Sequence, residues 1–110
     1  MKKTKTVTPA QANTLITDSG ALLIDVREQD EWNKVRIPGA VHKPMSRFAD
    51  WHDSLPRDRT VVVHCQSGAR SAKVVKALRK HSKHPDVTNL SGGIIDWAQD
   101  NYPIDAGPAR

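Results

Sequence analysis

Thr60-Val-Val-Val-His64-Cys65-Gln-Ser-Gly-Ala-Arg70 is the stretch that decides the fold. Its first five residues are mostly β-branched and predict a central strand over residues 60–64, with Cys65 at the carboxyl end. Residues 70–81 then place apolar side chains on one helical face and lysines on another, which predicts an amphipathic helix. A strand, a short loop and a helix are therefore expected in direct succession.

Similar units lie on either side of this stretch. Short apolar runs at residues 21–26 and 87–90 predict further buried strands. Helices are predicted at residues 9–17, 28–33, 46–55 and 94–101. Thr8 is expected to cap the first of these helices and Ser46 the third. Strands that alternate with helices predict an α/β fold with a mostly parallel central sheet flanked by helices on both faces.

Length and composition limit the classes of protein to consider. We expect the 110 residues to form a single domain, 1–110, with loose termini at residues 1–6 and 107–110. The formal net charge of +5 favours anionic substrates or partners. No apolar stretch is long enough for a membrane span or a secretion signal, and the single cysteine excludes an intramolecular disulfide. These features predict a cytoplasmic protein that does not contact a membrane.

Cys65 has the surroundings of a reactive thiol. It is predicted to lie between a strand and the amino end of a helix, where unpaired backbone N–H groups and the helix dipole stabilise negative charge. Gly68 lets the loop curl, and Arg70 adds a positive charge. These features predict a lowered pKa of the thiol and a nucleophile that needs no histidine base. The alternative is a small buried core residue. The nucleophile hypothesis requires a sulfur that is ionised at neutral pH and open to solvent.

Three further segments accompany the cysteine loop Cys65-Gln-Ser-Gly-Ala-Arg-Ser71. They are Leu22-Leu-Ile-Asp-Val-Arg-Glu28, Ile37-Pro-Gly-Ala40, and Leu90-Ser-Gly-Gly-Ile94 with Trp97. Together the four segments resemble, in the same order, the signatures of the single-domain rhodanese-like sulfurtransferases. The sequence departs from that pattern at Val35-Arg36, where family members commonly have Gly-His.

The resemblance implies a sulfurtransferase in which Cys65 is the nucleophile. Cys65 would attack the outer sulfur of a small anionic donor such as thiosulfate and hold it as a persulfide, which a thiol or cyanide acceptor removes. The implied substrate-binding residues are Gln66, Ser67, Gly68, Ala69 and Arg70, the last of which also attracts the donor. The residues implied to support the loop are Asp25, Arg27 and Ser71. The resemblance implies neither a metal nor an organic cofactor.

Other functions stay open on the sequence alone. A cysteine followed by an arginine also resembles cysteine phosphatases and arsenate reductases, but those have five residues between the two, whereas four separate Cys65 from Arg70. A non-catalytic docking module is a second alternative. A protein-to-protein persulfide relay is a third, and it would require a protein donor or acceptor.

The remaining polar clusters have structural explanations. The basic residues within 73–83 are expected to form a solvated helix face, and without interleaved aromatic residues they do not indicate nucleic-acid binding. His81 and His84 lack a third metal ligand, and His64 is interpreted as a hydrogen-bonded structural residue. The carboxylates of residues 28–31 are interpreted as a solvated face, and the three tryptophans as packing residues.

Overall fold

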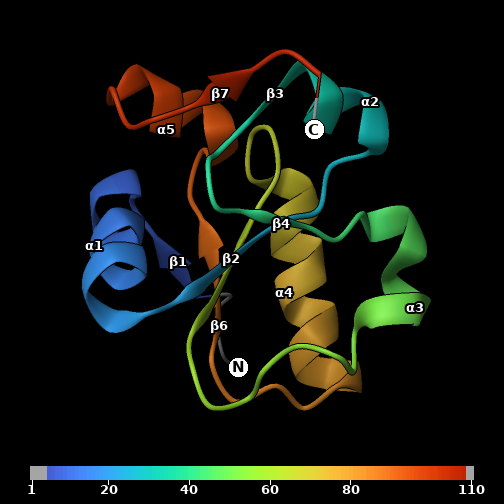
Figure 1. Cartoon of the computed structure of the whole chain (residues 1–110). Coiled ribbons are helices and arrows are strands. Elements are labelled where there is room, and N and C mark those ends of the chain that lie inside the picture. Colours follow the sequence, from blue (N-terminus) through green and yellow to red (C-terminus); the bar gives the residue numbers. More distant parts are fainter. Residues whose placement is uncertain (1–4, 109–110) are drawn as a thin grey trace.

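A five-stranded parallel sheet forms the centre of the computed structural model, which describes residues 5–108 (Figure 1). In spatial order its strands are β1 (Thr6–Val7), β6 (Val87–Leu90), β5 (Val61–His64), β2 (Leu22–Asp25) and β4 (Val41–His42). Each neighbouring pair runs parallel. The predicted parallel sheet is confirmed, with β5, the strand before Cys65, in its middle.

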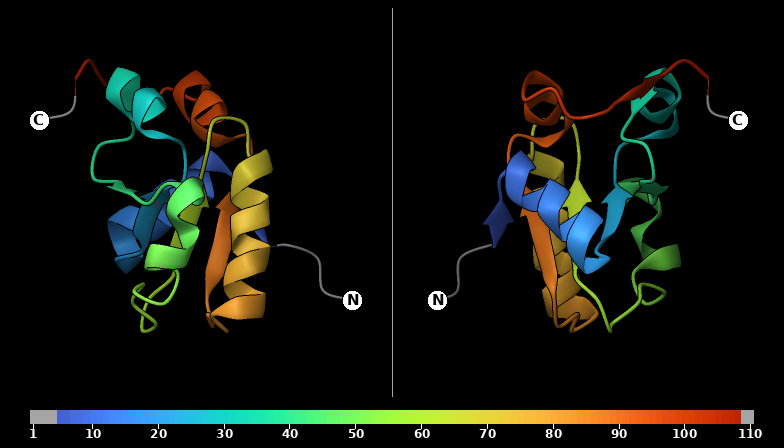
Figure 2. Two further views of the ribbon diagram at one scale, coloured as in Figure 1. Left: turned by 90° about the vertical axis from the view of Figure 1, so that its right-hand side faces the viewer. Right: turned by 60° about the vertical axis from the view of Figure 1, so that its left-hand side comes forward.

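Helices cover both faces of this sheet. They are α1 (Pro9–Ser19), α2 (Gln29–Lys34), α3 (Phe48–Trp51), α4 (Ala69–His81) and α5 (Gly93–Gln99), with a 3₁₀ turn η1 (Met45–Arg47) before α3. α1 and α5 lie on one side of the sheet, and α3 and α4 lie on the other (Figure 1). The right-hand view of Figure 2 shows α1 in front of the strands and α4 behind them. No helix of residues 5–108 has the length and apolar character needed to cross a bilayer.

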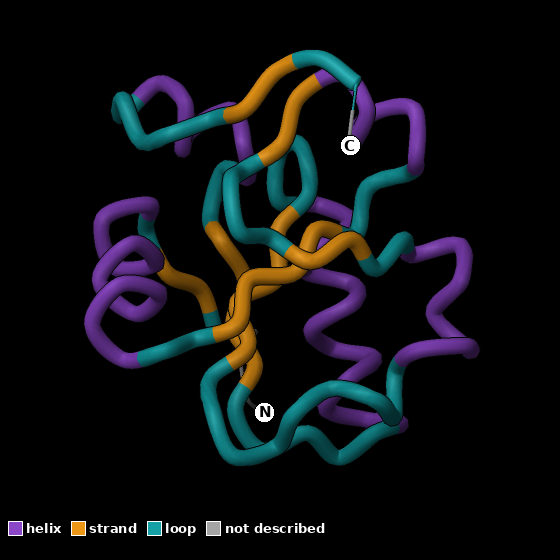
Figure 3. Tube along the Cα trace, viewed as in Figure 1, coloured by secondary structure: helices purple, strands orange, loops and turns teal. Residues whose placement is uncertain are grey.

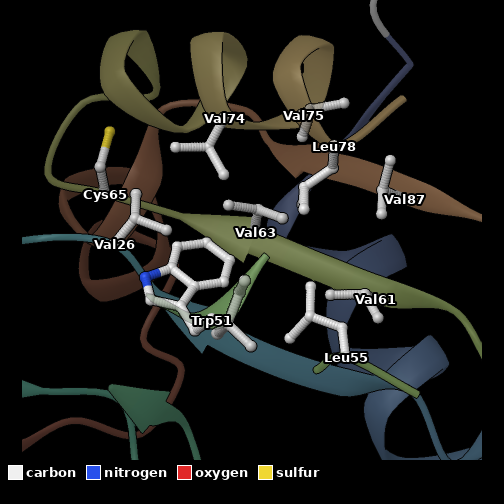
Figure 4. Packing of buried hydrophobic residues seen from close by; sticks show 11 residues of the cluster. Val26, Trp51, Leu55, Val61, Val63, Cys65, Val74, Val75, Leu78 and Val87 are labelled. Carbon is white, nitrogen blue, oxygen red and sulfur yellow. The ribbon is translucent and has the colours of Figure 1, made fainter. Parts of the chain in front are cut away.

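Alternate residues of β5 belong to two separate apolar clusters. Val61 and Val63 pack with Val74 and Leu78 of α4, as Figure 4 shows. Val62 belongs to the cluster on the α1 and α5 side. Successive side chains of a strand point to opposite faces of the sheet. A strand with helices on both sides therefore buries apolar residues at consecutive positions, which explains the continuous valine run.

The helix starts were predicted with mixed success. The capping box at α1 is confirmed: the Thr8 N–H donates to Gln11 Oε1 (2.9 Å), and the Gln11 N–H donates to Thr8 Oγ1 (3.1 Å). The predicted cap at Ser46 is wrong, because α3 is one turn that begins two residues later and ends before residue 55. The Ser46 hydroxyl instead donates to Glu28 Oε1 (2.6 Å), a charged acceptor that forms a stronger hydrogen bond than a neutral group.

A second, two-stranded sheet joins segments that are far apart in the sequence. β3 (Val35–Arg36) pairs antiparallel with β7 (Asp105–Ala106), and the two lie side by side at one end of the molecule (Figure 3). Arg36 is buried, and its guanidinium donates to the carbonyl oxygens of Trp32 (2.9 Å) and Gly107 (2.8 Å). The Val35-Arg36 departure noted in the sequence therefore anchors the segment that follows α5.

Both described chain ends make backbone hydrogen bonds to distant segments. Thr6 pairs with Asn89 at the edge of the main sheet. The Gly107 N–H donates to the Lys34 carbonyl oxygen (3.0 Å). The expectation for residues 1–4 and 109–110 lies outside the described residues. Local composition does not reveal such pairing with distant segments.

Candidate active site

Cys65 lies at the carboxyl end of β5, in the loop that leads into α4. This loop lies between α5 and α2, at the end of the sheet where the parallel strands terminate (Figure 1). Figure 4 shows Cys65 at the margin of the apolar cluster, with its sulfur directed toward the first turn of α4. The strand, loop and helix follow one another as the sequence predicts.

Hydrogen-bond donors of Gly68 and Ser71 lie around the Cys65 sulfur. The Gly68 N–H lies 3.1 Å from Sγ, the Ser71 hydroxyl 3.3 Å and the Ser71 N–H 3.4 Å. Gly68 has φ 102°, a left-handed conformation that favours glycine and curls the loop around the sulfur. Burial raises the pKa of the Cys65 thiol, but hydrogen bonds from Ser71, Gly68 and Ser67 outweigh it and lower the pKa below its ordinary value. The site thus favours a thiolate.

The donors to the resting sulfur include one of the predicted substrate-binding residues, Gly68, and one predicted loop-support residue, Ser71. Within residues 5–108, Gln66, Ala69 and Arg70 make no hydrogen bond to Sγ, although they were predicted to bind substrate beside it. Ser71, which was predicted only to support the loop, contacts the sulfur through both its hydroxyl and its N–H. Ser71 is the third residue of α4, where the backbone N–H has no partner within the helix.

The sulfur is less accessible than the nucleophile hypothesis requires. Only 1% of Cys65 is exposed, whereas the neighbouring residues Gln66, Ser67 and Ala69 are exposed. The sulfur therefore lies directly beneath an exposed loop. A reactant reaches it only when the loop or an adjoining side chain moves.

Asn89 on β6 is a site residue that the sequence analysis missed. Its Oδ1 accepts the Ser71 hydroxyl (2.5 Å), and its Nδ2 donates to the Gly68 carbonyl oxygen (3.2 Å). The Ser71 hydroxyl has a single proton, and three acceptors compete for it: Asn89 Oδ1, the Gly68 carbonyl oxygen (3.2 Å) and the Cys65 sulfur (3.3 Å). Asn89 thus holds both residues that donate to the sulfur. The sequence carried little signal for it, because Thr88 beside it on β6 is polar as well.

The amino end of α5 fixes the backbone of the loop. The Ile94 N–H donates to the Cys65 carbonyl oxygen (3.0 Å), and the Ile95 N–H donates to the Gln66 carbonyl oxygen (3.2 Å). Gly93 has φ 59°, and a Cβ there would overlap the carbonyl oxygens of Cys65 and Gln66. The loop carbonyls are therefore turned toward α5, which leaves nearby N–H groups free to face the sulfur.

Arg70 is paired with a carboxylate that the sequence analysis interpreted as part of a solvated face. Its Nη1 and Nη2 donate to Glu31 Oε1 and Oε2, each at 2.7 Å. The hydrogen bond from Arg70 is the main reason why the pKa of Glu31 falls to about 2, and the same bond raises the pKa of Arg70. Glu31 Oε1 also accepts the Glu28 N–H (3.1 Å) at the start of α2. The sequence analysis expected Arg70 to add a positive charge beside the thiol. In the structure Glu31 pairs with that charge.

Asp25 and Arg27 form a buried ion pair behind the loop. Arg27 Nη2 lies 2.8 Å from Asp25 Oδ2, the Arg27 N–H donates to Asp25 Oδ1 (2.9 Å), and Nη2 also donates to the Val35 carbonyl oxygen (2.6 Å). His64 lies between this ion pair and the cysteine loop. Its Nε2 is 3.5 Å from Asp25 Oδ2, and its Nδ1 is 3.2 Å from the Cys65 carbonyl oxygen. Burial lowers the pKa of His64, which favours the neutral ring although Asp25 lies nearby.

A small pocket adjoins the loop. Its volume is about 260 Å³, and its lining includes Gln66, Arg27, Ile95 and Ile104.

Among residues 5–108 no three His, Cys, Asp or Glu side chains converge as a metal site would require. His84, which had been considered as a ligand, instead contacts the Pro56 carbonyl oxygen (2.7 Å).

Comparison with known proteins places this geometry in a family. Residues 8–100 match the family described as the rhodanese-like domain. The chain belongs to this family. As a rhodanese-like domain it is 40% identical over 83 residues to a sulfurtransferase of Allochromatium vinosum, a match that covers 76% of this chain and 77% of that protein.

Two further matches agree with the family assignment. The chain is 38% identical over 105 residues to the probable adenylyltransferase/sulfurtransferase MoeZ of Mycobacterium tuberculosis, which covers 92% of this chain but only 26% of MoeZ. The structure of a rhodanese-related protein from Thermoplasma volcanium superposes with a TM-score of 0.82 at 27% identity, over 92% of this chain and 97% of that one. Membership of the family and the sulfurtransferase relatives support sulfur transfer as the general activity.

We expect the reactivity of Cys65 to depend on the Ser71 hydroxyl. Because only the thiolate reacts with iodoacetamide, the rate of alkylation should rise with pH around a midpoint below that of an ordinary cysteine, about 8.5. Ser71→Ala removes a donor to the thiolate, so the midpoint should move upward and the rate at pH 7 should fall several-fold.

Ser67→Ala is the matched control, because it removes a hydroxyl from the same loop but keeps the backbone N–H. Its profile should follow that of the wild type. An unchanged midpoint in Ser71→Ala would contradict the assignment of Ser71. A folded protein in which Cys65 does not react at any pH would show that the residue is structural.

Proposed function

We propose that this rhodanese-like domain moves a sulfane sulfur from a donor such as thiosulfate to a thiol or cyanide acceptor, through a persulfide on Cys65. The observation that carries the proposal is the set of donors around the Cys65 sulfur, at 3.1 to 3.4 Å from Gly68 and Ser71. Such donors stabilise a thiolate before the reaction and a persulfide anion after it.

The first half-reaction balances without an added oxidant. The Cys65 thiolate attacks the outer sulfur of thiosulfate, a new S–S bond forms, and the old S–S bond breaks. The electron pair of the broken bond leaves with sulfite. The negative charge passes to the outer sulfur of the persulfide, which is bonded to the Cys65 Sγ that the Gly68 and Ser71 N–H groups contact.

The second half-reaction regenerates the thiolate. An acceptor thiolate or cyanide attacks the outer sulfur of the persulfide, and the bond to Cys65 breaks with its electron pair on Cys65 Sγ. The products are a persulfide of the acceptor or thiocyanate. The pocket of about 260 Å³ next to Gln66 offers room for a small acceptor beside the loop.

A sulfur donor must reach the buried Cys65 sulfur. Because only 1% of Cys65 is exposed, the donor has to enter through a local movement of the loop or of the Arg70 side chain. Gln66, Ser67 and Ala69 are exposed and form the outer surface of the loop. Exposed loop backbone opens at a low free-energy cost compared with the core.

Phosphatase or arsenate reductase chemistry is less well supported. A phosphate or arsenate ion would have to compete for Arg70 with Glu31, whose two carboxylate oxygens accept both terminal nitrogens of the guanidinium. The loop has four residues between Cys65 and Arg70, one fewer than in those enzymes. A persulfide relay between proteins uses the same chemistry at Cys65 and differs only in the identity of the donor and acceptor.

Intact-mass spectrometry tests the proposal. Incubation with thiosulfate should add the mass of one sulfur atom to the wild-type chain, and a thiol reductant should remove it. Cys65→Ser should show no addition under the same conditions. If the folded wild-type chain stays unmodified by thiosulfate and by a more reactive thiosulfonate donor, the proposed function is wrong.

A further inference from the structure

We propose that Glu31 determines which sulfur donors the site accepts, by holding Arg70 in an ion pair that disfavours dianionic donors. The inference rests on the proposed function and deepens it. It concerns a residue of α2 that does not touch the sulfur but occupies the one cation of the cysteine loop. The donors that the site would favour carry the sulfane sulfur on a group of at most one negative charge, such as the persulfide of a thiol.

In the Glu31–Arg70 ion pair, the carboxylate occupies the donors that an oxyanion would use. Arg70 and Glu31 meet through two parallel hydrogen bonds of 2.7 Å, in which both carboxylate oxygens face both terminal nitrogens of the guanidinium. Without Glu31, an arginine would use the same two parallel hydrogen bonds to bind an oxyanion such as the sulfonate end of thiosulfate. An incoming oxyanion therefore has to displace the Glu31 carboxylate or bind without those two donors.

Glu31 is held in place from its own side. Its Oε1 accepts the Glu28 N–H (3.1 Å) within the capping box of α2, so the carboxylate is positioned even without Arg70. The side chains of Arg70 and Glu31 are 32% and 23% exposed, which limits the access of water to the pair. A partly buried, bidentate and preorganised pair is harder to break than an exposed one.

The ion pairs near the Cys65 sulfur are electrically neutral. Arg70 and Glu31 together carry no net charge, so a dianion gains little Coulomb attraction as it approaches the thiolate of Cys65. Behind the loop, Asp25 and Arg27 form a second neutral pair. The net charge of +5 is a sum over the whole chain, and salt weakens the effect at the cysteine loop of charges more than about 10 Å away.

A thiol persulfide fits the site with the same balance of atoms. The Cys65 thiolate attacks the outer sulfur of R–S–S⁻, the S–S bond of the donor breaks, and R–S⁻ leaves with the electron pair. One sulfur atom moves, and no external oxidant or reductant takes part. The donor presents no oxyanion that must compete with Glu31.

Glu31→Gln tests the inference. Glutamine keeps the size of the side chain and the acceptor for the Glu28 N–H, but it removes the negative charge. The probes are thiosulfate, a dianion, and benzenethiosulfonate, a monoanion that delivers the same sulfur atom. We expect kcat/KM to rise roughly tenfold with thiosulfate and only about threefold with benzenethiosulfonate, and the thiosulfate gain should shrink as salt is added.

Asp30→Asn is the matched control. Asp30 is an exposed neighbour on the same turn of α2, so this variant removes the same charge without touching Arg70. Its kcat/KM should stay near that of the wild type for both donors. Alkylation by uncharged iodoacetamide in each variant corrects for any change in the ionisation of Cys65.

The outcomes separate the inference from the proposed function. Equal gains with the two donors, no gain, or a loss of kcat/KM in Glu31→Gln would overturn the role of Glu31, because a residue that only positions Arg70 should lower the rate when it is changed. A gain of the same size in Asp30→Asn would also overturn it. If no variant acquires a persulfide from either donor, the proposed function fails instead.

Discussion

Replacement of Asp25 by alanine is expected to lower the free energy of unfolding by about 3–5 kcal/mol, because it leaves the Arg27 guanidinium buried without a counter-charge. Asp25 is 0% exposed and Arg27 is 1% exposed. The carboxylate accepts the Arg27 N–H (2.9 Å) and lies 2.8 Å from Nη2. A loss of this size is a large part of the stability of a domain of this length. Denaturation by urea, followed by circular dichroism, measures it.

Two controls isolate the burial of the charge. Asp50 forms a comparable contact with Arg47 (2.7 Å), but the two side chains are 61% and 70% exposed, so Asp50→Ala should change the stability little. Adding Arg27→Met to Asp25→Ala removes the stranded charge and should restore part of the lost stability. If Asp25→Ala unfolds at the same urea concentration as Asp50→Ala, the buried pair does not stabilise the fold as we argue.

Gly93→Ala is expected to damage both the fold and the cysteine loop. Gly93 has φ 59°, and a Cβ would overlap the carbonyl oxygens of Cys65 and Gln66. The left-handed conformation and the overlap together should cost about 2–5 kcal/mol of stability. Relief of the overlap moves α5 away from the loop and breaks the hydrogen bond from the Ile94 N–H. Sulfur transfer should then fall by roughly a hundredfold, because a displacement of about 1 Å is enough for such a loss.

Gly20→Ala is the control for the backbone conformation alone. Gly20 also has a positive φ, 69°, but no atom lies within 4 Å of the position of its Cβ. It should lose less stability, about 1–2 kcal/mol, and keep the wild-type rate of sulfur transfer. A Gly93→Ala protein that remains as active as Gly20→Ala would contradict the role of α5 in holding the loop.

Much of the fold was predictable because it depends on neighbouring residues. The valine run before Cys65, the lysine and apolar faces of α4, and the Thr8 capping box were all readable from short windows. The pairing of β3 with β7 was not, since each strand has two residues and the contact joins Arg36 to Asp105 across the chain. Ser46 was misassigned because its hydroxyl found a carboxylate on another segment.

The sequence predicted the site residues within the cysteine loop but not those that other segments bring to it. Cys65 and Gly68 follow directly from the order of strand, loop and helix. Glu31 and Asn89 were missed, because they lie 39 residues from Arg70 and 18 residues from Ser71 respectively. A carboxylate in a polar turn has the same sequence pattern whether it faces water or an arginine.

The order of residues by itself determined that a thiol would stand at the end of a buried strand, against the first amides of a helix. Those groups are consecutive in the chain, and their arrangement follows from backbone conformation. Only the tertiary structure decided that Cys65 is 1% exposed, that Arg70 is paired and that α5 holds the loop. These properties depend on which distant surfaces pack together, and packing is a property of the whole core rather than of any segment.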